Sequence, residues 1–461
     1  MAAREFPERV APATTEPVAR GFVDFLGGPV GRFAAVGRQR WWTPLRVLIS
    51  VALVFLSFGF LSKARCLEGV RGEDGVIGLN WSGDRQYIAA CYNDITPLYG
   101  GRGLDQPGFP YAYSWVEGDL TRYLEYPVLA GLFQGAVAWV SRLTYPLIER
   151  TPFTIPEASW YFGLTALVMS ALWVLTIRMV AELAGHRIWD TVLVAASPLV
   201  IVHAFTNWDI PSITFAVGAV LAASRGRYGV AGLLIGLGTA FKLWPLYLLG
   251  AYLVLAIRDR RFVPFLTMVF SAAVVWLVVN VPVMVMYPAG WGEFLRLNSE
   301  RGAEWTTIYQ IIVRNTPLPT YPVGLLNIVS FGLFAAACLA ILILGLRAPR
   351  RPRAVELIFL IVVAFLVFNK VWSPQYSLWL VIPAVLALPR WRLLLTWMTV
   401  DALVWPLLMW YMLGPEKMGI PSELLDAALL TRLALLTVMV VLVVRQMLEP
   451  GKPVEHRMVD A

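Results

Sequence analysis

The chain has 461 residues, of which 58% are hydrophobic, 13% aromatic and 15% charged, a composition unlike that of ordinary soluble domains. The formal net charge is +8, but the arginines lie in short segments between long apolar runs, as the positive-inside rule describes for membrane proteins. We therefore expect no nucleic-acid partner. The sequence predicts an all-α, polytopic integral membrane protein whose surroundings are the lipid bilayer.

Residues 1–42 form a Pro-, Ala- and Arg-rich tail that we expect to be disordered. Arg32, Arg38, Arg40 and Arg46 stand before or at the start of the first apolar run, which places the tail in the cytoplasm. That run extends from about 45 to 61 and starts too late for a cleaved signal peptide, so it is interpreted as a signal-anchor span.

A transmembrane domain is predicted over residues 43–446, with a cytoplasmic C-terminal tail at 447–461. Twelve further candidate spans follow the first: Pro127–Pro146, Trp160–Leu183, Thr191–Phe205, Ile210–Ala223, Val230–Phe241, Leu243–Ile257, Phe262–Met286, Val323–Leu346, Val355–Phe368, Tyr376–Leu388, Leu393–Met412 and Leu424–Val444. Two cytoplasmic termini require an even number of crossings, so about twelve helices are expected. The suspected break lies around residues 206–209, where the flanking segments are short and contain Pro198 and Pro211.

Residues 63–126 are predicted to form a structured first external loop, and residues 287–321 a second large one. Asp94 lies in the segment CYNDITPLYGGRGL, before a turn rich in Pro and Gly. A carboxylate held near the membrane surface among aromatic residues suits a general base, because partial desolvation raises its proton affinity. Judged from the residues alone, an aspartate in such a loop is more often a solvated carboxylate or a helix cap than a catalytic base. Four other acidic residues of the loop are comparable candidates for the base: Asp84, Asp105, Glu117 and Asp119.

The first external loop also holds Cys66 and Cys91, which would form a disulfide on an oxidising face of the membrane. Two free thiols remain the alternative. Cys338 lies inside an apolar run and is interpreted as a packing residue.

Three further groups of polar residues stand out after the first loop. Lys242, in FKLWP, falls within a long apolar stretch, where a lysine is costly and suggests a bound anion, or else extends to the interface. The segment NKVWSPQYS brings Lys370, Gln375 and Tyr376 to an outer turn, which suits an anion or sugar, or an ordinary turn with an interfacial aromatic residue. His203 stands near Asn207 and Asp209 and is expected to be hydrogen-bonded within the bundle.

The chain resembles the GT-C glycosyltransferases, in particular glycosyltransferase family eighty-seven, which contains polyprenyl-phosphate-mannose-dependent α-mannosyltransferases of actinobacterial envelopes. The resemblance covers about residues 43–445 and is carried by NDITPLY and EYPVLAGLF near the first loop, by AGLLIGLGTAFKLWPLYLL around Lys242, and by WSPQYSLWLVIP. The chain departs from the family's Gly-Gln pattern at residues 206–209, where it has Thr-Asn-Trp-Asp.

The resemblance implies an inverting transfer of a sugar, mannose by default, from a polyprenyl-phosphate donor to an envelope glycolipid or lipoglycan at the outer face of the plasma membrane. It implies that Asp94 is the catalytic base and that Lys242 contacts the donor phosphate. Further candidates for donor or substrate contacts follow: Tyr99, Arg102, Asn207, Asp209, Lys370, Gln375 and Tyr376. No DxD pair of the soluble nucleotide-sugar type stands out, so neither a metal nor another cofactor is expected. Two other interpretations of the chain are a lipid or sugar-lipid transporter and a non-enzymatic envelope scaffold.

Overall fold

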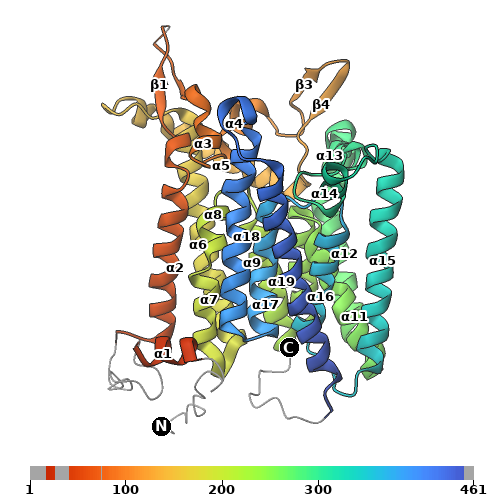
Figure 1. Ribbon diagram of the computed structural model, residues 1–461. Helices are drawn as coiled ribbons and strands as arrows, with labels where there is room; N and C mark the ends of the chain where they lie inside the picture. The colour runs from red at the N-terminus through yellow and green to blue at the C-terminus, as the bar shows by residue number, and fades with distance from the viewer. Residues whose placement is uncertain (1–16, 26–40, 74, 451–461) are drawn as a thin grey trace.

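The computed structural model describes residues 17–25, 41–73 and 75–450, most of them in helices. Within these residues, six helical stretches are long and apolar enough to cross a membrane: Pro44–Leu61 (α2), Glu157–Ala195 (which includes α6, Glu157–Ala184), Phe262–Met286 (α12), Val323–Arg347 (α15), Trp391–Met412 (α18) and Ser422–Leu448 (α19). Figure 1 shows α2, α15, α18 and α19 running between the same two ends of the molecule. The prediction of a mostly helical protein with membrane-spanning helices is therefore confirmed in its broad class.

Shorter apolar helices fill the space between the long ones. They are Ile210–Ser224 (α9), Tyr228–Phe241 (α10), Leu248–Asp259 (α11), Ala354–Phe368 (α16) and Leu378–Ala387 (α17), with short 3-10 turns at Trp244–Tyr247 (η5) and Pro374–Ser377 (η6). Nearly every residue of α9, α16 and α17 is buried, which fits interior helices that are apolar on all faces. Helix α10 approaches α12 closely, because a Cβ atom at Gly232 or Gly236 would meet the α12 backbone.

The stretch between α6 and α9 is broken, as the prolines predict. It contains η4 (Gly185–Thr191), α7 (Val192–Ala195) and α8 (Pro198–His203). Ser197 caps α8 by accepting a hydrogen bond from Leu199 N at 3.3 Å, and Pro211 occupies the first turn of α9. Residues 204–209 thus lie outside regular helix, where their polar groups are free to make tertiary contacts.

The segment predicted as the span Pro127–Pro146 forms α5 (Val128–Glu149), which is long enough to cross a membrane but is not among the six apolar stretches. Instead, α5 lies along the first external loop. A Cβ at Gly131 would meet Tyr111, one at Gly135 would meet Pro110, and Arg142 donates to the carbonyl of Leu104. These contacts cover three turns of the helix. The segment is therefore helical as predicted, but one of its apolar faces is buried against the loop. In sequence, a helix buried in this way resembles a membrane span.

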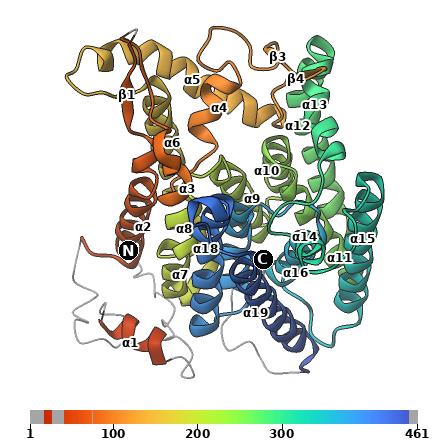
Figure 2. The same cartoon turned by 45° about the horizontal axis from the view of Figure 1, so that its top comes forward.

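The first external loop is not purely helical, in contrast to the all-α prediction. It contains two antiparallel hairpins, Gly69–Arg71 (β1) with Ile77–Leu79 (β2) and Ser114–Glu117 (β3) with Leu120–Tyr123 (β4), in which Trp115 faces Arg122. Its short helices are Ala64–Cys66 (η2), Ser82–Asp84 (η3), Arg85–Ile88 (α3) and Ile95–Gly101 (α4). The second loop forms Pro288–Glu300 (α13) and Ile308–Asn315 (α14), and Pro415–Lys417 (η7) joins α18 to α19. In Figures 1 and 2, β1, β3, α4 and α13 gather at one end of the bundle.

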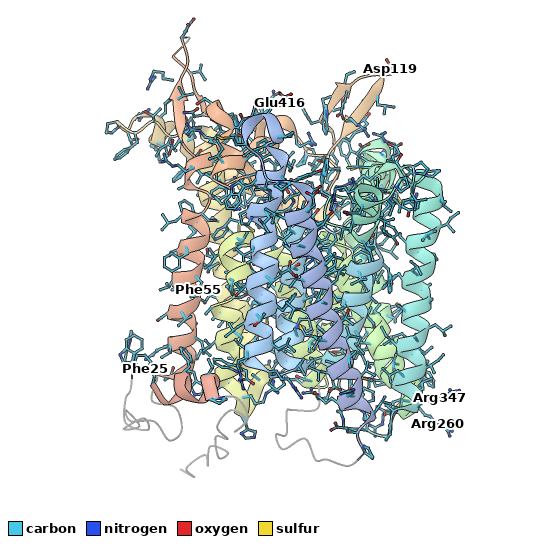
Figure 3. All side chains as sticks on the ribbon, in the orientation of Figure 1. Phe25, Phe55, Asp119, Arg260, Arg347 and Glu416 are labelled. Atoms are coloured by element: carbon cyan, nitrogen blue, oxygen red, sulfur yellow. A yellow bond between two sulfur atoms is a disulfide. The ribbon has the colours of Figure 1, made fainter. Side chains whose placement is uncertain are left out.

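Charged residues lie at both ends of the bundle. Figure 3 shows Asp119 and Glu416 at the end that carries the hairpins, and Arg260 and Arg347 at the opposite end. The start of α2 and the end of α19 also lie at that opposite end (Figure 1).

Within the N-terminal tail, for which disorder was the expectation, Pro17–Phe25 forms a short helix, α1. The Phe22 ring lies 5.8 Å from that of Trp391, so α1 is packed against the start of α18. Residues 1–16 and 26–40, with Arg32, Arg38 and Arg40, and most of the C-terminal tail (451–461), lie outside the described residues.

Cys66 and Cys91 are joined by a disulfide in the structure, with their Cα atoms 5.6 Å apart and a sequence separation of 25. Closing a loop of this length restricts the unfolded chain and should stabilise the fold by about 3 kcal/mol. The double replacement C66S/C91S should therefore lower the stability of the protein in detergent by that amount, as measured by denaturant unfolding. C338S, in α15, serves as the control, and equal stability of all three proteins would show that the bridge contributes nothing.

Candidate active site

A cavity of about 650 Å³ opens where the loops at residues 63–126 and 287–321 meet the ends of several helices. Its walls come from the first loop, from the break between α8 and α9, from the α10–α11 junction, from the second loop and from the ends of α16 and α18. The polar and aromatic residues that line it include Tyr92, Asp94, Arg102, Glu125, Tyr126, Asn207, Lys242, Arg301, Glu304, Ser373, Gln375, Tyr376 and Trp379. It is large enough for a sugar and part of a lipid headgroup.

Asp94 immediately precedes α4, and it lines this cavity. Its backbone N–H donates to the carbonyl of Thr206 at 2.7 Å, which ties the first loop to the α8–α9 break. One carboxylate oxygen accepts from Asn207 Nδ2 at 2.6 Å. Burial raises the pKa of Asp94 above its ordinary value, although hydrogen bonds from Asn207 and Tyr92 and the charge of Lys242 act in the opposite direction.

Asn207 connects Asp94 to the buried lysine. Its Nδ2 also donates to the Tyr126 hydroxyl at 3.0 Å, and its Oδ1 accepts from Lys242 Nζ at 3.2 Å. Because the amide nitrogen serves two acceptors and the amide oxygen serves the cation, the orientation of this side chain is fixed. Asn207 therefore holds the carboxylate and the ammonium group at a constant spacing.

Lys242 is buried at the end of α10, where its backbone turns from helical to extended. Its ammonium group forms an ion pair with Asp209 at 2.6 Å, and Asp209 also accepts from Trp379 Nε1 at 2.9 Å. Trp379 stacks on Tyr376 with ring centroids 4.2 Å apart, and Lys242 Nζ lies 5.3 Å from the Tyr376 ring. The charge of Lys242 is thus compensated inside the protein, beside two aromatic rings that face the cavity.

The model of glycosyltransferase family 87 matches residues 123–374, more than half of the chain. The chain belongs to glycosyltransferase family 87. The matched region begins after Asp94 and includes Asn207, Asp209 and Lys242. A comparison with curated proteins finds no match.

The other predicted contacts of this glycosyltransferase divide into two groups. Arg102, Gln375 and Tyr376 line the cavity. Arg102 donates from two nitrogens to Glu125, each at 2.7 Å, and its guanidinium lies 4.2 Å from the Trp115 ring. Its charge is therefore satisfied by a bidentate ion pair.

Lys370 and Tyr99 do not line the cavity. Lys370 Nζ donates to the carbonyl of Arg301 at 2.7 Å, and the Tyr99 hydroxyl donates to Glu157 at 2.8 Å. Asp209 lies behind Lys242 and is 1% exposed. These three side chains support the walls of the cavity.

Asp84, Asp105, Glu117 and Asp119, the other candidate bases of the first loop, lie outside the cavity lining. Asp94 lies within it, as does Glu125, which pairs with Arg102. Asp84 pairs with Lys417 at 2.6 Å, and Glu117 with Arg122 at 2.9 Å. Within the described residues, no group of three or more His, Cys, Asp and Glu is placed to hold a metal ion.

His203 differs from the expectation of a hydrogen-bonded histidine. Its side chain is buried, and neither ring nitrogen has a hydrogen-bond partner among the described residues. It packs edge-on against Trp405 at 5.6 Å. The expectation of a hydrogen bond was wrong: the ring packs against Trp405, and the charged groups near it, Lys63 and Arg432, make no hydrogen bond to it.

The sequence analysis missed several lining residues, above all Arg301 and Glu304 of the second loop, which form an ion pair at 2.8 Å. Tyr126 was also missed, although it stands in the EYP motif at the end of the first loop. The second loop is rich in charged residues, but nothing in the sequence shows that Arg301 and Glu304 face the same cavity as Asp94.

Proposed function

We propose that this glycosyltransferase moves a sugar, mannose in the first instance, from a polyprenyl-phosphate donor to a hydroxyl group of an envelope glycolipid or lipoglycan, with inversion at the anomeric carbon. The observation that carries the proposal is the connected set Asp94, Asn207 and Lys242 at the wall of one cavity. In this set a carboxylate and an ammonium group lie on either side of one amide, which suits a base and a phosphate-binding cation.

In the proposed reaction, Asp94 removes the proton of the acceptor hydroxyl while that oxygen attacks the anomeric carbon. The bond between the anomeric carbon and the phosphate oxygen breaks, and its electron pair stays on the phosphate. The released polyprenyl phosphate therefore gains one negative charge. Lys242 stands where it stabilises that charge, since preorganised cations near a developing anion are effective in sites shielded from water.

Sugar transfer in membranes tests the proposal. Labelled polyprenyl-phosphate-mannose is incubated with membranes containing the protein and with an envelope lipid extract, and membranes lacking the protein serve as the control. Label that enters a glycolipid with the protein supports the proposal. Label that stays on the donor rules out mannose, and the same assay with polyprenyl-phosphate-arabinose then decides whether another sugar replaces it.

We further propose a GT-C type membrane domain of twelve crossings in the plasma membrane, with α5 and the cavity on the extracytoplasmic side. The arginine-rich end, which holds the start of α2 and the end of α19, would face the cytoplasm under the positive-inside rule. With α5 outside, the thirteen candidate spans reduce to an even number. The disulfide between Cys66 and Cys91 suits an oxidising compartment on the same side.

Thiol labelling of intact cells tests this topology. Phe153 follows α5 and is 68% exposed, so F153C should react with a membrane-impermeant maleimide. R260C, at the opposite end (Figure 3), should react only after the cells are permeabilised. The reverse result, with F153C protected in intact cells, would mean that α5 crosses the membrane.

A further inference from the structure

Hydrogen bonds to backbone carbonyls hold the second loop (residues 287–321) in place beside the cavity. Lys370 Nζ donates to the carbonyl of Arg301 at 2.7 Å, and Glu304 N donates to the carbonyl of Lys370 at 2.9 Å. Arg432, buried in α19, donates to the carbonyl of Thr306 at 2.7 Å. The backbone of residues 301–306 is therefore held from two sides, while the side chains of Arg301 and Glu304 face the cavity.

Among the cations that line the cavity, Arg301 is the least compensated. Arg102 is held by a bidentate ion pair, and Lys242 is buried against its own carboxylate. Arg301 uses one nitrogen for Glu304, at 2.8 Å, and its side chain is 36% exposed. No acceptor among the described residues is placed on its other guanidinium nitrogens.

Arg301 and Glu304 also lie near the reacting groups. Both interact electrostatically with Tyr376, whose ring faces Lys242, and Glu304 interacts with the charge of Asp94. Burial raises the pKa of Glu304, although the charge of Arg301 acts against this. An anion bound in the cavity beside Tyr376 would therefore interact with the charges of both Lys242 and Arg301.

We propose that Arg301 binds the phosphate of the lipid donor, and that this phosphate displaces Glu304, which pairs with Arg301 in the structure. The proposal rests on the proposed function and adds a second phosphate contact to it. As the bond from the anomeric carbon to the phosphate oxygen breaks, the phosphate gains a negative charge that Arg301 offsets. A guanidinium group suits this task because its N–H groups match two phosphate oxygens at once.

Binding of farnesyl phosphate tests the proposal without requiring sugar transfer. Its dissociation constant is measured by calorimetry in detergent micelles, with farnesol as the probe that lacks the phosphate. R301Q should weaken the binding of farnesyl phosphate by about 10- to 100-fold, the loss expected for one charge-assisted contact. E304Q should tighten it, since the competing carboxylate is removed, and the binding of farnesol should change in neither variant.

R296Q is the matched control, because Arg296 lies on α13 and pairs with Glu293 and Glu300 outside the cavity lining. Its affinity for farnesyl phosphate should equal that of the wild type. Equal affinity in R301Q, or weaker affinity in E304Q, would overturn the proposal. If R301Q binds normally while the wild type transfers sugar, Arg301 is excluded and the proposed function stands. If the wild type binds farnesyl phosphate through Arg301 but transfers no sugar, the phosphate site stands and the proposed function falls.

Discussion

Replacing Asp94 by Asn is expected to lower the rate of sugar transfer by about 10²–10⁴-fold, the range found when a general base is removed. The amide of the variant cannot take a proton from the acceptor hydroxyl. Its oxygen can still accept from Asn207 Nδ2, which donates to Asp94 at 2.6 Å in the native protein. The fold and the amount of protein in the membrane should therefore stay unchanged, so that the loss reports chemistry.

D119N is the matched control for this experiment. Asp119 belongs to the same loop, at the exposed turn between β3 and β4, and lies outside the cavity lining (Figure 3). The D119N variant should transfer sugar at the native rate. Native turnover by D94N, with D119N unchanged, would remove Asp94 from the mechanism.

The pH dependence of transfer gives a second readout of the base. As the proposed base, Asp94 would act in its deprotonated form, so activity should be lost as the pH falls through its pKa. Because burial raises the pKa of this carboxyl, the acid limb of the rate profile should lie above the usual range of an aspartate, about 3.9. D94N should lack this limb. A limb that persists in D94N would belong to another group.

The sequence could identify residues whose chemistry conflicts with their surroundings. Lys242 was recognisable because an ammonium group within an apolar run is costly unless it is paired. Asp94 was one of several comparable carboxylates in its loop, and the family resemblance singled it out. Both line the cavity. The break around residues 206–209 was likewise predictable from Pro198 and Pro211, since proline removes a helical hydrogen bond.

The sequence could not show which distant segments meet. Arg301 reaches the cavity because Lys370 and Arg432 hold the backbone of its loop, and contacts between such distant residues leave no local pattern. The packing of helix α5 was hidden for a related reason. Its apolar face packs on the first loop at Gly131 and Gly135, and a helix that covers a loop has nearly the composition of one that faces lipid.

Replacing Lys242 by Met is expected to destabilise the protein by about 3–5 kcal/mol, because it leaves the buried carboxylate of Asp209 without its counter-charge. Asp209 is 1% exposed and would retain Trp379 as its donor. The measurement is denaturant unfolding in detergent. R225Q serves as the control, since the Arg225–Glu182 pair is 44% and 46% exposed and such pairs contribute at most about 1 kcal/mol. A K242M variant as stable as R225Q would mean that the buried pair does not support the fold.

The double variant K242M/D209N separates the structural role of Lys242 from its proposed role in catalysis. Removing both charges of a buried pair is often close to neutral, and the amide oxygen that replaces the carboxylate of Asp209 would still accept from Trp379. Most of the lost stability should therefore return. Sugar transfer should not return, because the cation that we propose to contact the donor phosphate is still absent. Recovery of both stability and transfer would assign Lys242 to the support of the fold alone and leave Arg301 as the phosphate contact of the cavity.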